Sequence, residues 1–225
     1  MFLACSKLAG EWMFGKKNTD SQKYKTIFNG VEVEKYLYNE SIRKQYRENL
    51  GFGDSFIIAN IGRFSYQKNQ SFLVEVFSRF HQTFPNSKLV FVGSGELETS
   101  IKEKVNALGL NEKVIFLGLR KDVYCLLSAF DVMVMPSRFE GLPVTMVEAQ
   151  MASLPCVVSA NITDEAKFTK NVEYVEGWEI CRWVKLIKQT SMVKRPYDKD
   201  CLINSIFNTV NASLELQNIL TGEYK

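Results

Sequence analysis

Short apolar runs rich in β-branched residues alternate with longer segments of helical periodicity through most of the chain. Such alternation is typical of repeated strand–helix units arranged around a parallel sheet. It therefore predicts the α/β class, with a Rossmann-like parallel sheet and helices on both of its faces. The predicted strands are residues 56–61, 88–92, 114–117, 131–135 and 156–159, with a weaker one at 172–175.

The intervening segments carry the period of amphipathic helices. In residues 70–84, for example, Phe72, Val76 and Phe80 fall on one stripe, and Pro85 ends the pattern. Further helices are predicted at residues 96–108, 122–129, 143–152 and 178–189, and one last helix at about 199–220.

The first fifty residues follow a different pattern. A short helix at 7–14, a strand-like segment at 24–28 and a charged helix at 40–50 are predicted, and these do not complete a second sheet. We therefore expect residues 1–50 to be an appendage, 51–192 to form one domain, and 193–225 to hold a C-terminal helix.

The composition excludes several classes of function. The net charge of +3 is spread along the 225 residues, so nucleic acid is a poor candidate partner. No apolar run reaches the ~20 residues that a membrane-spanning helix needs, and a cytoplasmic protein is expected. The 5 cysteines lack a Cys-x-x-Cys pair. His81 is the only histidine, so neither a histidine-rich metal site nor a Ser-His-Asp triad can be built elsewhere in the chain, and His81 itself has the polar neighbours of a solvated helix position.

The first candidate motif follows the predicted strand 56–61. It begins at Gly62 and contains Arg63 and Lys68. Because the carboxyl edge of a parallel sheet is where α/β proteins bind ligands, these two cations are placed to hold a diphosphate. The competing interpretation is that both are ordinary solvated loop charges.

Two further glycine-containing motifs also follow predicted strands. Gly93-Ser94-Gly95-Glu96 resembles the start of a dinucleotide fingerprint, but Glu98 occupies the place of its third glycine, so a simple tight turn is an alternative. The third motif, Gly118-Leu119-Arg120, offers backbone groups that either read a base edge or only turn the chain.

The fourth motif contains two glutamates. Glu140 lies at a predicted strand-to-helix junction, Glu148 lies on the helix, and Gly141-Leu142-Pro143-Val144 follows the first of them. Pro143 suits the first turn of a helix, whose N-terminus favours a bound anion such as a phosphate. The alternative is a pair of solvated carboxylates near a helix start.

All four motifs fall at the same predicted sheet edge, and their chemistries are complementary. Cations and a helix N-terminus suit a diphosphate, whereas carboxylates accept hydrogen bonds from sugar hydroxyls. A nucleotide-diphosphate sugar offers both kinds of group. A nucleoside triphosphate normally requires a Gly-rich Lys-Ser/Thr loop, which the chain lacks.

In this order and at these spacings, the motifs resemble those of the retaining glycosyltransferases of family 4, which adopt the two-domain GT-B fold. The matching residues are Gly62-Arg63-Phe64 with Lys68-Asn69, Val92-Gly93-Ser94-Gly95-Glu96-Leu97, Phe116-Leu117-Gly118, and Pro136-Ser137-Arg138-Phe139-Glu140-Gly141-Leu142-Pro143-Val144 followed by Glu148-Ala149-Gln150. The resemblance is strongest over residues 50–190, and within the family it is closest to enzymes that build capsular polysaccharides or exopolysaccharides. Residues 4–10 and 29–31 resemble the end of the family's N-terminal domain and the start of the interdomain segment. The chain therefore looks like a donor-binding C-terminal half with a remnant of its partner domain.

The resemblance implies a role for each site residue. Arg63 and Lys68 would hold the donor diphosphate and stabilise the leaving group, Glu140 would contact the donor sugar, and Glu148 would bind the ribose. Gly62, Gly93, Gly95, Glu96, Gly118, Leu119 and Arg120 would border the nucleotide, and the amides of Gly141, Leu142, Pro143 and Val144 would face the phosphates or the sugar.

The resemblance further implies that no cofactor or divalent metal is needed and that the acceptor is a saccharide or a lipid-linked saccharide. Peripheral contact with the inner face of a membrane would follow from a lipid-linked acceptor. Ser153 departs from the family by replacing a glycine, a change expected to be tolerated in a helix C-cap.

Two other functions remain as alternatives. The chain could be a non-catalytic nucleotide-sugar-binding module that works with a separate partner chain. It could also be a sugar-nucleotide epimerase or a phosphorylase on a related fold, although no motif supports the lysine that a pyridoxal phosphate cofactor would require.

Overall fold

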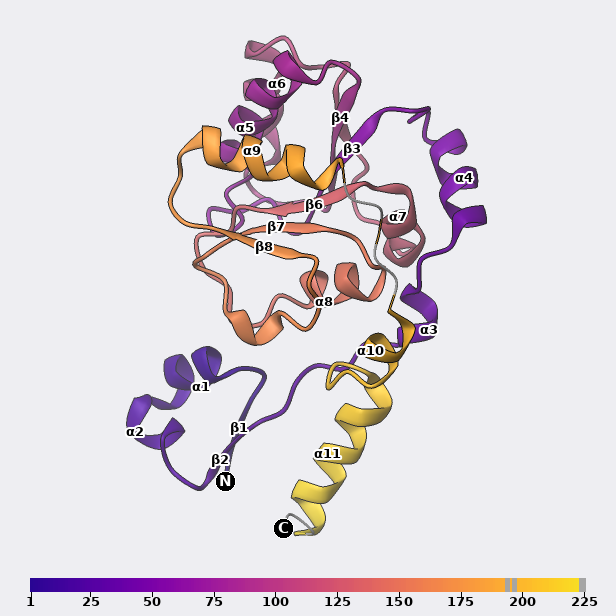
Figure 1. Ribbon diagram of the computed structural model, residues 1–225. Coiled ribbons are helices and arrows are strands. Elements are labelled where there is room, and N and C mark those ends of the chain that lie inside the picture. Colours follow the sequence, from indigo (N-terminus) through magenta and orange to yellow (C-terminus); the bar gives the residue numbers. More distant parts are fainter. Residues whose placement is uncertain (193–194, 196–197, 223–225) are drawn as a thin grey trace.

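The computed structural model describes residues 1–192, 195 and 198–222, and it contains a 6-stranded parallel sheet (Figure 1). The strand order is β5-β4-β3-β6-β7-β8, which confirms the predicted α/β class. The strands are β3 (Phe56–Ile61), β4 (Ser87–Val92), β5 (Val114–Phe116), β6 (Val132–Met135), β7 (Cys156–Ser159) and β8 (Val172–Val175).

The strand order contains one reversal. From β3 the chain steps outward through β4 to β5, and it then returns to place β6 on the other side of β3. From β6 it steps outward again through β7 to β8. The gap outside the carboxyl ends of β3 and β6 is therefore the topological switch point, where doubly wound sheets bind their ligands.

The N-terminal residues form a small unit of their own, and the prediction that they complete no second sheet is wrong. β1 (Phe2–Ala4) and β2 (Tyr24–Thr26) pair in parallel, with α1 (Lys7–Phe14) and α2 (Lys16–Thr19) in the connection between them. Each strand has 3 residues, too few to show a period-two pattern in the sequence. Two further helices, α3 (Val33–Tyr36) and α4 (Glu40–Asn49), lead into the main sheet.

The α4 helix is fastened to the main domain by arginines. Arg43 and Arg47 pair with Asp131 at 2.6 and 3.2 Å, and Arg47 also donates to the carbonyl oxygens of Gly53 and Ala129. Arg195, from the segment before α10, donates to the carbonyls of Leu127 and Phe130. These guanidinium groups thus satisfy carbonyls at the end of α7 (Val123–Ala129) that have no partner inside their helix.

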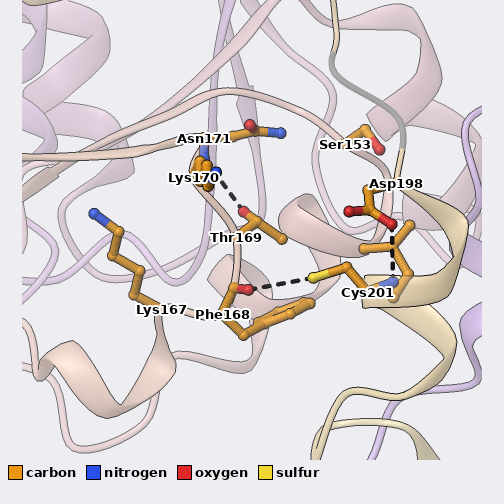
Figure 2. Close-up of a pocket in the computed structure, with 9 residues that line it drawn as sticks. Ser153, Lys167, Phe168, Thr169, Lys170, Asn171, Asp198 and Cys201 are labelled. Carbon is orange, nitrogen blue, oxygen red and sulfur yellow. Dashed lines mark hydrogen bonds between the residues drawn. The ribbon is translucent and has the colours of Figure 1, made fainter.

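The single C-terminal helix expected at about 199–220 is instead two helices, α10 (Lys199–Ile203) and α11 (Thr209–Thr221). Asn208 interrupts the helical path because its side chain caps α11 by accepting from the N–H of Val210. The buried ring of Phe207 packs on Phe28 and Phe168, and Cys201 donates to the carbonyl of Phe168 (Figure 2). Residues 193, 194, 196, 197 and 223–225 of the predicted C-terminal segment lie outside the described part.

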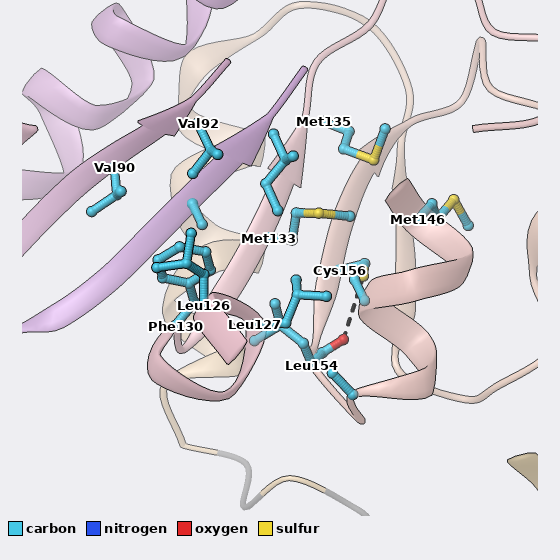
Figure 3. Packing of buried hydrophobic residues seen from close by; sticks show 14 of the residues in the cluster. Val90, Val92, Leu126, Leu127, Phe130, Met133, Met135, Met146, Leu154 and Cys156 are labelled. Atoms are coloured by element: carbon cyan, nitrogen blue, oxygen red, sulfur yellow. Dashed lines mark hydrogen bonds between the residues drawn. The ribbon is translucent and has the colours of Figure 1, made fainter. Parts of the chain in front are cut away.

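Helices cover both faces of the main sheet (Figure 1). On one face α5 (Gln70–Thr83), α6 (Glu98–Ala107) and α9 (Ile180–Thr190) supply Leu73, Phe77, Ile101 and Trp183 to a buried cluster. On the other face, α7 and α8 (Val144–Met151) pack Leu126, Leu127, Met146 and Ala149 against Met133 and Met135 (Figure 3). Because both faces are buried, the strands are apolar runs rather than alternating patterns, which is why they could be located in the sequence.

Candidate functional site

The loops after β3, β4 and β5 surround a cavity of about 530 Å³ at the carboxyl edge of the sheet. This position follows from the parallel order, since every strand in the sheet ends at the same edge. The cavity lining contains six of the predicted site residues: Gly62, Arg63, Gly93, Gly95, Leu119 and Arg120. Three motifs that are separate in the sequence therefore line one cavity.

The glycines at 93 and 95 are required by contact between two loops. A Cβ atom on Gly93 would lie 2.1 Å from the carbonyl oxygen of Gly62, and one on Gly95 would lie 2.4 Å from that of Phe64. The N–H of Gly93 also donates to the carbonyl of Gly118 at 2.8 Å. Side chains at either position would push apart the loops that line the cavity, so these glycines determine its shape.

Lys68 and Glu140 meet at the switch point. Nζ of Lys68, at the end of the loop after β3, lies 2.6 Å from Oε1 of Glu140, in the loop after β6, and the two side chains are only 16% and 9% exposed. The side chain of Lys68 also lies against Gly62. The predicted cation and the predicted sugar-binding carboxylate are thus direct neighbours, and the ammonium faces a carboxylate where a ligand phosphate is expected.

The second predicted cation, Arg63, is more open to solvent. Its Nε lies 3.1 Å from Oε2 of Glu96, and the two side chains are 74% and 52% exposed. The pKa of Glu96 is lowered by a hydrogen bond from its own backbone N–H and by Arg63. An exposed pair of this kind contributes little to stability, so Arg63 can exchange Glu96 for a ligand anion at small cost.

Arg120 is held in place at the rim of the cavity. Its guanidinium donates to both carboxylate oxygens of Asp122, at 2.8 and 2.6 Å, and Tyr46 donates to Oδ2 at 2.9 Å. The hydrogen bonds from Arg120 and Tyr46 lower the pKa of Asp122 to about 2. Asp122 therefore stays ionised and fixes the arginine beside the exposed side chain of Leu119.

Glu148 lies on α8 and already accepts a hydrogen bond from a residue of α3. The hydroxyl of Tyr36 donates to Oε1 at 2.6 Å. Burial raises the pKa of Glu148, while the Tyr36 hydrogen bond and the charge of Lys35 oppose that change. One carboxylate oxygen is thus held by Tyr36, and no donor among the described residues bonds to the other.

The start of α8 differs slightly from the prediction. Pro143 occupies the N-cap instead of the first helical turn, and its carbonyl accepts from the N–H of Met146 at 2.9 Å. Oγ1 of Thr145, in the first turn, is buried and has no hydrogen-bond partner among the described residues. The first N–H groups of a helix have no carbonyl partner inside it, which is the arrangement that an anion site uses.

The N-terminal unit lies next to this turn. A Cβ atom on Gly141 would sit 3.4 Å from Cβ of Ala9, so α1 approaches the Glu140–Gly141 turn closely. The N–H of Lys7, at the start of α1, donates to both carboxylate oxygens of Glu165, at 3.0 and 2.9 Å. Residues of the N-terminal unit therefore lie against the turn that follows Glu140.

Four contributors were not identified from the sequence: Gln67, Tyr36, Asp122 and Glu165. Each acts by a contact that depends on the tertiary fold, and none carries a periodic or motif signal of its own. For Gln67, the only available signal was its position next to the predicted site residue Lys68.

A second cavity of about 530 Å³ lies elsewhere, next to the residues that precede β7 and β8 (Figure 2). It is lined by Ser153, Lys167, Lys170 and Asp198, among others. Since it opens near the amino ends of the strands, away from the four motifs, we do not assign it to the same site.

Two features are absent from the described part of the chain. It contains no group of three or more His, Cys, Asp or Glu side chains placed to hold a metal ion. Nor does any of its helices have the length and apolar character needed to cross a membrane.

Comparison with known proteins gives a consistent family. Residues 42–177 match the model of the glycosyl transferases group 1. EpsF of Bacillus subtilis, which is named as a glycosyltransferase, is 30% identical over 228 residues, covering 94% of this chain and 59% of EpsF. The UDP-Gal:alpha-D-GlcNAc-diphosphoundecaprenol alpha-1,3-galactosyltransferase of Escherichia coli is 35% identical over 156 residues, or 68% of this chain and 40% of that protein.

The fold has solved counterparts as well. The crystal structure of Anabaena HepE in complex with UDP-glucose superposes with a TM-score of 0.83 and 21% identity, covering 98% of this chain and 63% of HepE. The predicted GT-B-type α/β fold is therefore confirmed. This chain spans 59% of the length of EpsF and 40% of that of the E. coli enzyme. With its four motifs assembled at one sheet edge and its sequence matched from residue 42 to residue 177, the chain belongs to the group 1 glycosyl transferases.

Proposed function

We propose that this chain is the donor-binding part of a glycosyltransferase that moves a sugar from a nucleotide-diphosphate donor to a saccharide or lipid-linked acceptor in polysaccharide biosynthesis. We further propose that it follows family 4 and retains the anomeric configuration. The observation that carries the proposal is the Lys68–Glu140 pair at the switch point, where the cation predicted to bind a diphosphate meets the carboxylate predicted to bind a sugar. A nucleotide-diphosphate sugar is the ligand that needs both groups at one place.

The geometry supports a separate role for each group of site residues. Bond breaking leaves negative charge on the departing nucleoside diphosphate, which Lys68, Arg63 and the N-terminus of α8 would stabilise. Glu140 would accept hydrogen bonds from donor-sugar hydroxyls, and the free oxygen of Glu148 would accept from the ribose. The cavity between Gly62, Gly95 and Leu119 would take the nucleotide base.

The names of related proteins support the proposed classes of sugar donor and acceptor. The E. coli relative is named for a UDP-galactose donor and a diphosphoundecaprenol-linked acceptor, and the HepE structure holds UDP-glucose. We accordingly propose a uridine diphosphate sugar as donor, a saccharide or lipid-linked acceptor, and a cytoplasmic location in contact with the inner face of a membrane. No cofactor or metal is included in the proposal.

A second candidate is a non-catalytic nucleotide-sugar-binding module that acts with a separate partner chain. In this alternative the same four motifs bind the donor, and transfer requires the second chain. Slow release of sugar from UDP-sugar by the isolated chain would favour the enzyme. Binding without turnover until an N-terminal domain is added would favour the module.

Calorimetric titration with UDP, ADP and GDP tests the donor site. Arg63→Ala and Glu148→Ala are each expected to weaken binding of the preferred nucleotide about tenfold, the effect of losing one charge-assisted hydrogen bond. Arg79→Ala and Glu103→Ala, at exposed helical positions, are matched controls that should bind as the unchanged chain does. Unaltered affinity in both site variants would overturn the assignment.

A further inference from the structure

Gln67 connects the loops on the two sides of the switch point. Its Nε2 donates to Oε2 of Glu140 at 3.1 Å and to the carbonyl of Phe139 at 3.0 Å. Its own carbonyl accepts from the N–H of Arg138 at 2.8 Å. Gln67 belongs to the loop after β3, whereas all three of these contacts are with residues of the loop after β6.

The two oxygens of Glu140 are therefore held by adjacent residues of different charge. Lys68 holds Oε1 through an ammonium group, and Gln67 holds Oε2 through a neutral amide. An incoming diphosphate competes with Glu140 for the ammonium of Lys68, because both are anions. It does not compete for the amide in the same way, since a neutral donor gains less from a second anion.

We propose that Gln67 is a positioning residue that keeps the Glu140 carboxylate directed at the donor sugar while Lys68 neutralises the donor diphosphate. The proposal rests on the function proposed above and adds a residue to it. Without the amide, Glu140 would be free to rotate or to follow Lys68 toward the phosphates. Gln67 thus favours the sugar nucleotide over the nucleoside diphosphate that remains after transfer.

The test compares two ligands in one variant. Gln67→Met keeps the length of the side chain but removes its donor. Calorimetry is expected to show UDP affinity within twofold of the unchanged chain and UDP-glucose or UDP-galactose affinity reduced about tenfold, the loss of one hydrogen bond to a charged group. The control is Gln45→Met, an exposed position on α4, which should alter neither affinity.

A second variant separates positioning from a merely structural role. In Gln67→Glu the ionised carboxylate repels Glu140, but its protonated form can again donate to Oε2. Discrimination between UDP-glucose and UDP should therefore be lost at pH 8 and partly return near pH 5.5 in this variant, and the methionine variant should show no such return. A thermal melt of each variant shows whether it is folded under the titration conditions.

The outcomes are distinguishable. If the unchanged chain binds none of UDP, ADP or GDP, the proposed function fails and this inference fails with it. If the chain binds UDP and the sugar nucleotide but folded Gln67→Met loses affinity equally for both, or for neither, the proposed function stands and the positioning role of Gln67 is overturned. A pH-independent ratio in Gln67→Glu would contradict the role as well.

Discussion

Nζ of Lys68 lies 2.6 Å from Oε1 of Glu140, so the cation expected to hold the donor diphosphate is paired with the carboxylate expected to hold the donor sugar. Both side chains are nearly buried, at 16% and 9% exposure. The pair keeps each charge compensated while the site is empty, since an isolated buried charge is costly. Donor binding would then replace one partner of the lysine with a phosphate.

Replacing Lys68 with methionine should have two effects. It removes the diphosphate contact, so UDP affinity measured by calorimetry is expected to fall at least tenfold. It also leaves Glu140 without its cation, which should lower the free energy of unfolding by about 2 kcal/mol. Lys44→Met, at an exposed position on α4, makes the same charge change and should do neither. Full UDP affinity in a folded Lys68→Met variant would contradict the diphosphate role.

Glu148 should show a conflict between stability and binding. Burial raises its pKa, so the folded protein binds a proton at this carboxyl more readily than the unfolded chain does. The contribution of Glu148 to stability is therefore favourable at low pH and is lost as the pH rises through the raised pKa. At pH 7, Glu148→Gln is expected to melt at a higher temperature than the unchanged chain and to bind UDP about tenfold more weakly. A lower melting temperature would show that the ionised carboxylate is the stabilising form.

The pH dependence of binding gives an independent check on Glu148. The protonated carboxyl accepts hydrogen bonds poorly, so UDP affinity should fall as the pH drops through the raised pKa of this group, which lies above the usual ~4.3. Tyr36 donates to the carboxylate and lowers that pKa. Tyr36→Phe should consequently move the acid limb of the affinity profile to higher pH. An unshifted profile in this variant would mean that another group governs the limb.

The main sheet could be predicted because its physical causes are local. Strands buried on both faces are continuous apolar runs, and the helices between them have a clear hydrophobic periodicity. The location of the motifs at the carboxyl edge of the sheet could therefore be predicted as well. The partners of the site residues could not be predicted in this way. The hydrogen bond between Tyr36 and Glu148 joins residues 112 positions apart, and the one between Lys7 and Glu165 joins residues 158 positions apart. In neither pair does the sequence around one residue specify the other.

The features that were wrongly predicted share a different cause. β2 lies in the predicted strand-like segment 24–28, but its pairing with β1 was not predicted, because strands of 3 residues each carry no signal of their partner. The break between α10 and α11 depends on Asn208 and on the burial of Phe207, neither of which disturbs the helical pattern in the sequence. Short elements and interior caps are decided by tertiary contacts instead of propensity.

Arg47 should be among the most important residues for stability outside the site. Its side chain is 12% exposed, pairs with Asp131, and donates to the carbonyls of Gly53 and Ala129. Arg47→Met would remove these bonds, of which Arg43 keeps only its own to Asp131 and to the carbonyl of Ala129, and urea unfolding should show a loss of about 3 kcal/mol. The control Arg79→Met, at an exposed position on α5, is expected to change stability by less than about 0.5 kcal/mol. A loss below 1 kcal/mol for Arg47→Met would show that α4 is not held by this arginine.

Ser153 and Gly109 occupy equivalent positions after two different helices, which allows a prediction of opposite sign at each. Ser153 has φ 52° and Gly109 has φ 67°. After α8, the N–H groups of Ser153 and Leu154 donate to the carbonyls of Gln150 and Ala149, and after α6 those of Gly109 and Leu110 donate to Asn106 and Val105. Both helices thus end in the same left-handed cap, where glycine is the residue without strain.

Ser153→Gly should therefore raise the free energy of unfolding by about 1 kcal/mol, and Gly109→Ala should lower it by about the same amount. No heavy atom lies within 4 Å of a Cβ added at Gly109, so that loss would come from backbone strain alone, without a clash. In thermal melts the two changes correspond to shifts of about 2–4 °C in opposite directions. Because Ser153 and Gly109 follow the C-terminal ends of their helices and neither lines the cavity at the carboxyl edge, UDP affinity should stay unchanged in both variants. If Ser153→Gly is destabilising, the buried serine hydroxyl contributes more than the strained backbone costs, and the serine is favoured at this cap for its side chain.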